Sequence, residues 1–221
     1  MTWIKICGMT NLEDALVAVD AGADAVGFVF YEKSPRCVTV ETARDICEKL
    51  PSRTDKVGVF VNEPPGRVSK LADDAGLTAV QLHGDEYKNP ENFKSGGKLV
   101  FTLPMLEMLR DVRGKAGFYG FPKLPAGSTV LLDSGSREQP GGTGKAFAWG
   151  EGQQFISALK RFYPVIVAGG LTSLNVTWAT ELLKPWGVDV ASGVEASPGK
   201  KDPEKVRAFV RAVREYDRKV G

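Results

Sequence analysis

Short apolar runs alternate with longer segments of helical pattern along the whole chain. The runs have the length of β-strands, and several are continuously apolar, as expected for parallel strands that are covered on both faces. The expected strands span residues 4–7, 25–30, 56–60, 79–82, 98–103, 129–133, 165–168 and 188–192. This alternation of strands with helical segments predicts an α/β protein with a parallel sheet.

Three of the helical segments have recognisable starts. Asn11 is suited to cap the first helix, which Gly22 would end, and a second helix begins near Thr39. Asp202 is suited to cap a C-terminal helix that has Pro203 in its first position and apolar residues at helical spacing. A helix therefore follows the first and second strands, and another helix ends the chain.

A short pattern recurs along the chain at multiples of one strand–helix unit. The segments AGADAVGF (21–28), AGLTAVQL (75–82) and WGVDVASG (186–193) each contain a helix end, a glycine and a strand. Their separations fit a repeat of about 27 residues, so the chain would hold about eight units. Eight units favour a single (β/α)₈ barrel over residues 1–221, with an open doubly wound sheet as the alternative. No G-x-G-x-x-G motif follows the first strand, which weakens the dinucleotide-binding form of that alternative.

Composition and charge narrow the class of protein. The 221 residues are 43% hydrophobic and carry a formal net charge of +2. This is enough apolar content for one core, and too little charge for a dedicated nucleic-acid or membrane-surface protein. The chain has no basic leader before an apolar stretch and no apolar run of membrane-spanning length. We expect a soluble cytoplasmic protein with its three cysteines as free thiols.

In a (β/α)₈ barrel, catalytic groups lie at the carboxyl ends of the strands and in the loops that follow. The polar residues at those positions are Cys7, Arg36, Asn62, His83, Asp133 and Ser192. Lys5 and Cys7 share one face of the first strand, which we expect to point into the barrel. A buried Lys5 ammonium needs a partner there, and Asp133 and Asp189 are the available carboxylates.

Each candidate has a structural interpretation beside the functional one. Cys7 ends a strand before a glycine and a helix start, a setting that gives weight to a reactive thiolate against an inert core cysteine. Asp133 is either a turn cap or a proton donor in a partly desolvated pocket. His83, the single histidine, is either a substrate contact or a hydrogen-bonded core residue, and without clustered acids it speaks against a metal site. Arg36 is either a solvated loop residue or a bidentate grip for a carboxylate.

Three glycine-containing loops follow the last three strands: PGGTGKAF, AGGLTSLN and SGVEASPGKKD. Backbone N–H groups of such loops frequently bind phosphate in barrels. The candidate phosphate ligands are Gly142, Thr143, Gly144, Gly169, Gly170, Ser192 and Gly193. Lys145, Lys200 and Lys201 are expected to be solvated. The residues alone thus predict a barrel enzyme for a small phosphorylated substrate with a carboxylate, a Cys/Asp acid–base pair and no metal.

Seven segments resemble the phosphoribosylanthranilate isomerase family of tryptophan biosynthesis, in the family's order and at suitable spacing. The segments are KICGMT, GFVF…SPR, VGVFVN, QLHG, LLDS…GGTGKAF, AGGLTSLNV and DVASGVEASPGKKD. The resemblance implies a (β/α)₈ barrel that catalyses an Amadori rearrangement. In it, N-(5-phosphoribosyl)anthranilate becomes 1-(2-carboxyphenylamino)-1-deoxyribulose 5-phosphate without a metal or redox cofactor.

The resemblance also implies roles for individual residues. Asp133 is then the general acid that protonates the ring oxygen and opens the sugar to a Schiff base, and Cys7 is the base that removes the C2′ proton. Arg36 would hold the anthranilate carboxylate, and the three glycine loops would hold the phosphate. Two features depart from the family pattern: Ala148 stands where an aspartate usually precedes the tryptophan, and the segment 113–127 is somewhat longer than usual.

Two other functions remain open at this point. The histidine-pathway isomerase performs the same rearrangement on an aminoimidazole carboxamide ribotide, but resembling members carry an aspartate where this chain has Cys7. A non-catalytic phosphosugar-binding barrel would keep the glycine loops and lose Cys7 or Asp133. Both residues are present, so the anthranilate reaction is favoured, in a monomer or homodimer.

Overall fold

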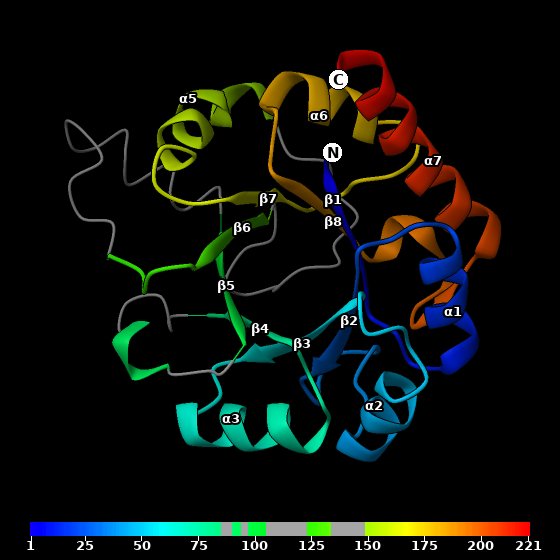
Figure 1. Ribbon diagram of the computed structural model, residues 1–221, viewed down its shortest axis with the longest axis vertical. Helices are drawn as coiled ribbons and strands as arrows, with labels where there is room; N and C mark the ends of the chain where they lie inside the picture. The colour runs from blue at the N-terminus through cyan, green and yellow to red at the C-terminus, as the bar shows by residue number, and fades with distance from the viewer. Residues whose placement is uncertain (85–89, 94–96, 105–122, 134–148) are drawn as a thin grey trace.

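The computed structural model of the protein contains eight parallel strands that close into a barrel (Figure 1). The structure describes residues 1–84, 90–93, 97–104, 123–133 and 149–221. The barrel strands are β1 Trp3–Cys7, β2 Ala25–Phe30, β3 Asp55–Val61, β4 Ala79–His83, β5 Lys98–Pro104, β6 Thr129–Asp133, β7 Val165–Val167 and β8 Gly187–Val190. Each strand pairs with the next, and β8 pairs with β1. The predicted barrel is confirmed, and the expected strands differ from these only at their ends.

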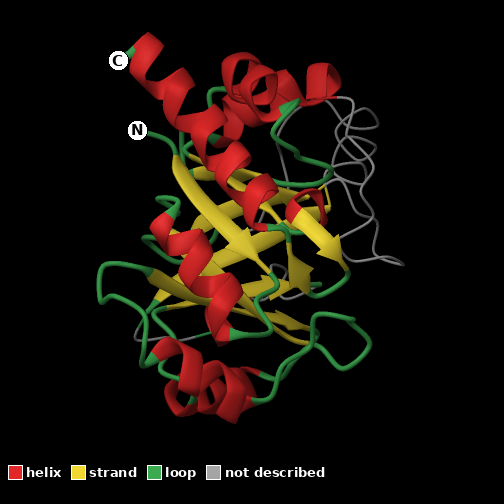
Figure 2. Cartoon of the chain, turned by 90° about the vertical axis from the view of Figure 1, so that its right-hand side faces the viewer, coloured by secondary structure: helices red, strands yellow, loops and turns green. Residues whose placement is uncertain are grey.

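Helices cover the outside of the barrel (Figures 1 and 2). They are α1 Leu12–Asp20, α2 Val40–Cys47, α3 Pro65–Asp74, α5 Trp149–Leu159, α6 Val176–Leu183 and α7 Pro203–Val220. The shorter elements are the 3₁₀ helices η2 Pro90–Asn92 and η3 Ser192–Val194 and the strands β9 Glu195–Ser197 and β10 Lys200–Lys201. Helix α7 contacts both α1 and α6, so the last helix lies beside the first. No helix in the described part of the chain is long and apolar enough to cross a membrane.

The expected helix starts are confirmed. Asn11, Thr39 and Asp202 each accept a hydrogen bond from backbone N–H groups in the first turn of α1, α2 and α7. These N–H groups have no acceptor within their own helix, so the caps stabilise the point at which each helix leaves its loop. Helix α1 ends at Asp20, and Gly22 follows with a left-handed φ of +98°.

Strand alternation separates an apolar shell from the barrel interior. Ile4 and Ile6 of β1 are fully buried in the large cluster of apolar residues between strands and helices. Trp3 packs against apolar clusters inside the barrel, at the amino ends of the strands, and its ring stacks on Trp186 with centroids 5.2 Å apart. The interior is therefore apolar near Trp3, and its polar groups lie farther along the strands.

The two ends of the chain lie side by side (Figures 1 and 2), where the side chain of Asp217 accepts hydrogen bonds from Thr2.

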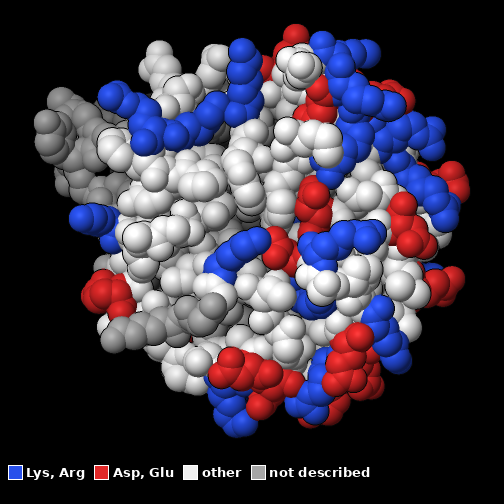
Figure 3. Space-filling model, in the orientation of Figure 1, with Lys and Arg blue, Asp and Glu red and all other residues white. Residues whose placement is uncertain are grey.

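Figure 3 shows basic and acidic side chains interspersed on the face of the molecule that is seen in Figure 1, with basic ones more frequent near α7. The mixture agrees with the small net charge of the chain.

Candidate active site

A buried ion pair lies inside the barrel where β1 and β8 meet. Lys5 Nζ donates to Asp189 Oδ1 at 2.9 Å, and the two side chains are 1% and 10% exposed. The expected inward direction of Lys5 is confirmed, and its partner is Asp189. Burial opposes the ammonium, but Asp189 raises the pKa of Lys5 above its usual value. The two residues are register partners across the seam that closes the barrel, so strand pairing fixes the ion pair.

Cys7 is the last residue of β1 and lies next to this ion pair. Its thiol is free and buried. Burial raises the pKa of the thiol, and the neighbouring Lys5 ammonium opposes that shift without cancelling it. The sequence suggested that a nearby helix start would favour the thiolate, but desolvation is the larger effect. In the ligand-free protein, Cys7 is therefore a thiol at neutral pH, beside a cation that would stabilise its thiolate.

Gly27 of β2 leaves the space that both side chains of β1 occupy. A Cβ atom on Gly27 would lie 2.8 Å from Cys7 Sγ and 2.9 Å from Lys5 Cε. Gly27 is also the register partner of Cys7. Any side chain at this position would therefore displace the thiol, the ammonium or both.

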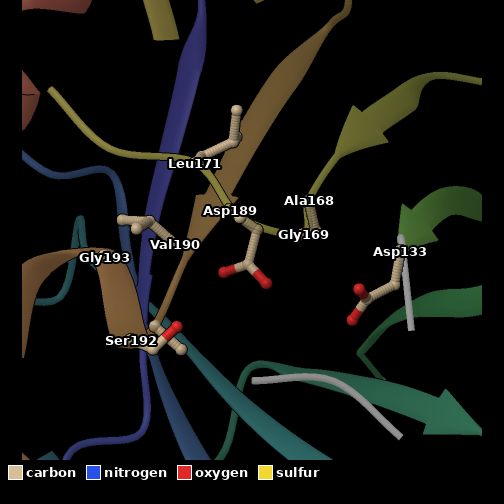
Figure 4. A pocket seen from close by; sticks show the side chains of 10 residues that line it. Asp133, Ala168, Gly169, Leu171, Asp189, Val190, Ser192 and Gly193 are labelled. Atoms are coloured by element: carbon tan, nitrogen blue, oxygen red, sulfur yellow. The ribbon is translucent and has the colours of Figure 1, made fainter. Parts of the chain in front are cut away.

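A small pocket opens at the carboxyl ends of β6, β7 and β8 (Figure 4). Its lining residues are Asp133, Ala168, Gly169, Gly170, Leu171, Asp189, Val190, Ala191, Ser192 and Gly193. The carboxylates of Asp133 and Asp189 both point into its space (Figure 4). Asp189 both lines the pocket and pairs with Lys5, so the pocket adjoins the buried ion pair.

Four of the residues expected to bind phosphate line this one pocket: Gly169, Gly170, Ser192 and Gly193. The two loops that supply them are in close contact, because a Cβ atom on Gly193 would overlap the carbonyl oxygen of Leu171. Gly142, Thr143 and Gly144, together with Lys145 and Ala148, lie outside the described residues.

His83 and Asp133 are neighbours at the mouth of the barrel. His83 ends β4 and Asp133 ends β6, with Nε2 of the histidine 3.9 Å from Oδ2 of the aspartate. The two side chains are only 16% and 13% exposed. The sequence placed both at strand ends, and the fold brings them to one site.

Among the described residues, no group of three or more His, Cys, Asp or Glu side chains is arranged to hold a metal ion.

Arg36 is held by a carboxylate that sequence analysis missed. Its Nε and Nη2 atoms donate to the two carboxylate oxygens of Glu195 at 2.8 and 2.7 Å. Lys201 Nζ donates to Oε1 of the same glutamate at 2.9 Å. The expectation that Lys201 is solvated is wrong, because it is 1% exposed and paired with Glu195, whereas Lys200 is exposed as expected. Alternation along the short strand β10 was the signal that separates the two lysines.

The closed barrel, with its acid, thiol and glycine loops at the carboxyl ends of the strands, defines a (β/α)₈-barrel enzyme. Residues 4–212 match the family described as N-(5'phosphoribosyl)anthranilate (PRA) isomerase. The chain belongs to this family and is an isomerase of tryptophan biosynthesis.

Individual relatives agree with the family match. The chain is 45% identical to the N-(5'-phosphoribosyl)anthranilate isomerase of Pelobacter propionicus, with 97% of each chain covered. Identity to that of Thermotoga neapolitana is also 45%, over 96% of this chain and 98% of the relative.

Solved structures of the family share the fold. The phosphoribosyl anthranilate isomerase of Thermotoga maritima matches with a TM-score of 0.78 and 39% identity, over 97% of this chain and 100% of that one. A phosphoribosyl anthranilate isomerase in complex with reduced 1-(o-carboxyphenylamino)-1-deoxyribulose 5-phosphate has a TM-score of 0.75 and 36% identity, over 97% and 100% of the two chains.

Proposed function

We propose that the chain converts N-(5-phosphoribosyl)anthranilate to 1-(2-carboxyphenylamino)-1-deoxyribulose 5-phosphate with Cys7 as general base and Asp133 as general acid. The observation that carries the proposal is the position of these two residues at the ends of β1 and β6, around one barrel mouth. The relative bound to the reduced reaction product supports a ligand of this chemical class. Cys7 and the family match both favour this reaction over the histidine-pathway rearrangement and over plain phosphosugar binding.

The phosphate of the substrate is assigned to the pocket formed by Gly169, Gly170, Ser192 and Gly193. Backbone N–H groups in glycine-rich loops suit an anion because they approach it closely and donate hydrogen bonds. Asp133 lines the same pocket, so a bound phosphate would leave the ribose next to its carboxyl group. The loop with Gly142, Thr143 and Gly144 is assigned to the same phosphate by the family resemblance.

The reaction then proceeds by two proton transfers at fixed positions. Asp133 donates a proton to the ring oxygen, the C1′–O bond breaks, and the open chain is a protonated Schiff base. Cys7, as thiolate, takes the proton from C2′ and leaves an enolamine, which tautomerises to the ketone. Proton transfer by positioned groups accelerates such steps by roughly 10²- to 10⁴-fold.

Lys5 has a supporting role in this mechanism. Cys7 must lose its proton before it can act, since burial keeps it a thiol at neutral pH. The Lys5 ammonium lies beside the sulfur and favours its thiolate, and the Asp189 carboxylate that pairs with Lys5 partly offsets this effect by raising the pKa of the thiol. Asp189 in turn keeps the buried ammonium paired while Cys7 is still a thiol.

Arg36 is proposed to bind the carboxylate of the anthranilate ring, and His83 to contact the substrate beside Asp133. Arg36 follows β2 and His83 ends β4, so the two side chains would approach the substrate from different parts of the barrel mouth.

We also propose a cytoplasmic enzyme that is a monomer or homodimer, and size-exclusion chromatography with light scattering would distinguish the two states. A relative from Thermotoga maritima is described as a dimeric protein.

The activity can be tested by fluorescence. Phosphoribosylanthranilate is generated in the cuvette from anthranilate and phosphoribosyl pyrophosphate with a separate transferase, and its fluorescence is followed after the protein is added. We expect rapid decay with the parent protein and near-background rates with Cys7→Ala and Asp133→Ala. No decay with a folded parent would contradict the proposal.

Replacement of Gly27 tests the placement of the base. We expect Gly27→Ala to lower kcat by about tenfold or more with a smaller change in KM, because the methyl group displaces Cys7 and Lys5 rather than the phosphate loops. Steady-state kinetics separates the two parameters. The control is Gly66→Ala, whose methyl group would meet nothing within 4 Å. An increase in KM at unchanged kcat would contradict this account of Gly27.

Replacement of Gly193 tests the phosphate site. A methyl group there would overlap the Leu171 carbonyl oxygen and push apart the loops after β7 and β8. We expect Gly193→Ala to raise KM by about tenfold or more, and to weaken competitive inhibition by inorganic phosphate in proportion. If KM rises while phosphate inhibition is unchanged, the phosphate binds elsewhere.

A further inference from the structure

Three charged side chains form a buried hydrogen-bonded group beside the proposed carboxylate site. The side chain of Arg36 is 13% exposed, that of Glu195 is 5% exposed and that of Lys201 is fully buried. Oε1 of Glu195 accepts from both Arg36 Nε and Lys201 Nζ, and Oε2 accepts from Arg36 Nη2. Both cations are therefore hydrogen-bonded to one shared carboxylate, and the guanidinium is fixed by two parallel hydrogen bonds.

The two hydrogen bonds to Glu195 use only one edge of the guanidinium. They involve Nε and Nη2, so the carboxylate approaches Arg36 from the side. A guanidinium has five N–H donors in one plane, and the edge formed by its two terminal nitrogens offers a second fork that also matches a carboxylate. Arg36 can therefore hold Glu195 and a second carboxylate at the same time.

Lys201 decides the net charge of this group. Arg36 and Glu195 alone would be neutral and would attract an anionic ligand weakly. The buried Lys201 ammonium adds one positive charge next to Glu195, and it also donates to the carbonyl oxygen of Ala191 at 3.3 Å. The three residues together carry a charge of +1 in a poorly hydrated place, where electrostatic attraction is stronger than in water.

The hairpin that carries Glu195 and Lys201 is anchored to the segment that follows Cys7. The backbone N–H of Lys201 donates to Asp14 of α1 at 2.7 Å, and Thr10 donates to the carbonyl oxygen of Gly199. These contacts fix β9 and β10 against the loop between β1 and α1. The guanidinium of Arg36 is thereby held at a defined position relative to the proposed base.

We propose that Glu195 and Lys201 are positioning residues for carboxylate recognition, which aim the second edge of the Arg36 guanidinium at the substrate and keep the group cationic. The inference rests on the proposed role of Arg36. Neither residue touches the substrate, and both act through Arg36. Removing either should weaken the binding of ligands that bear the aromatic carboxylate and spare ligands that lack it.

The test compares two ligands by isothermal titration calorimetry. One is reduced 1-(2-carboxyphenylamino)-1-deoxyribulose 5-phosphate, and the other is its phenylamino counterpart without the carboxyl group. The dissociation constant of the phenylamino ligand divided by that of the carboxyl-bearing ligand measures carboxylate recognition. Lys201→Met should lower this ratio by roughly tenfold, because the group loses its net positive charge. Glu195→Gln should also lower it, because the guanidinium loses the two parallel hydrogen bonds that orient it, and this loss outweighs the positive charge that the group gains. Steady-state kinetics should show a higher KM at nearly unchanged kcat.

Controls separate this inference from the proposed function. Lys200→Met removes an exposed charge from the same hairpin and should leave the ratio unchanged. Binding of the phenylamino ligand reports that each variant is folded, and either of the two variants alone suffices for the test. An unchanged ratio in a folded Glu195→Gln or Lys201→Met variant overturns the inference. If the ratio still falls in Arg36→Met, the proposed role of Arg36 is retained. If Arg36→Met also leaves the ratio unchanged, the role of Arg36 itself is wrong.

Discussion

Replacement of Cys7 by alanine should lower kcat by roughly 10²- to 10⁴-fold, the usual contribution of a positioned general base. KM should change far less, because the proposed role of the thiol is to remove the C2′ proton and not to bind the phosphate. Cys7→Ser should be similarly impaired, since a hydroxyl group of the same size is a much weaker acid and supplies almost no anionic base near neutral pH. Stopped-flow fluorescence under single-turnover conditions measures this step directly.

The structure also predicts how kcat/KM depends on pH. Burial raises the pKa of Cys7, so the inactive thiol dominates at neutral pH and the active thiolate forms as the pH rises. We therefore expect kcat/KM of the parent to increase from neutral to alkaline pH. Cys37→Ser, at an exposed cysteine, serves as the control and should keep the parent profile. A Cys7→Ala variant within tenfold of the parent would remove Cys7 from the mechanism.

Replacement of Lys5 by methionine should have the largest effect on stability. It leaves the Asp189 carboxylate without its partner in the barrel interior, and breaking a buried pair in this way costs roughly 3–5 kcal/mol. Urea denaturation of parent and variant gives the difference in the free energy of unfolding. Lys98→Met is the matched control, because the Lys98 side chain is 63% exposed and its pair with Asp55 should contribute about 1 kcal/mol or less.

The same variant tests the coupling between Lys5 and Cys7. Without the ammonium, the pKa of Cys7 rises further, and the alkaline rise of kcat/KM should move to higher pH. The double variant Lys5→Met/Asp189→Asn should recover part of the lost stability, since no unpaired charge remains. Its pH profile should stay above that of the parent, but by less than in Lys5→Met, because Asp189 no longer raises the pKa of Cys7. A profile that returns to that of the parent in the double variant would mean that Lys5 acts only through folding.

Much of the fold follows from local sequence patterns. Continuous apolar runs predicted the strands, because every strand of a closed barrel is covered on both faces. Asn11, Thr39 and Asp202 were recognised as caps because capping involves only neighbouring residues. The inward direction of Lys5 followed from the parity of β1, which no bulge disturbs.

The site was less predictable where it depends on contacts between distant loops. Glu195 and Arg36 are far apart in the sequence and meet only because the loops after β2 and β8 converge at one barrel mouth. The direction of the pKa shift of Cys7 could not be predicted for a related reason. A helix start is visible in the sequence, but the desolvation that dominates the pKa depends on the packed surroundings of the thiol.

The measurement that tests the central claim most directly is a crystal structure of the protein with reduced 1-(2-carboxyphenylamino)-1-deoxyribulose 5-phosphate. If Cys7 and Asp133 are the base and the acid, Sγ of Cys7 should lie about 3–3.5 Å from C2′. Asp133 should lie within hydrogen-bond distance of the hydroxyl group derived from the ring oxygen, with the phosphate at the loops of Gly169 and Gly193. A ligand with C2′ far from Cys7, or with its phosphate at the opposite side of the mouth, would contradict the mechanism.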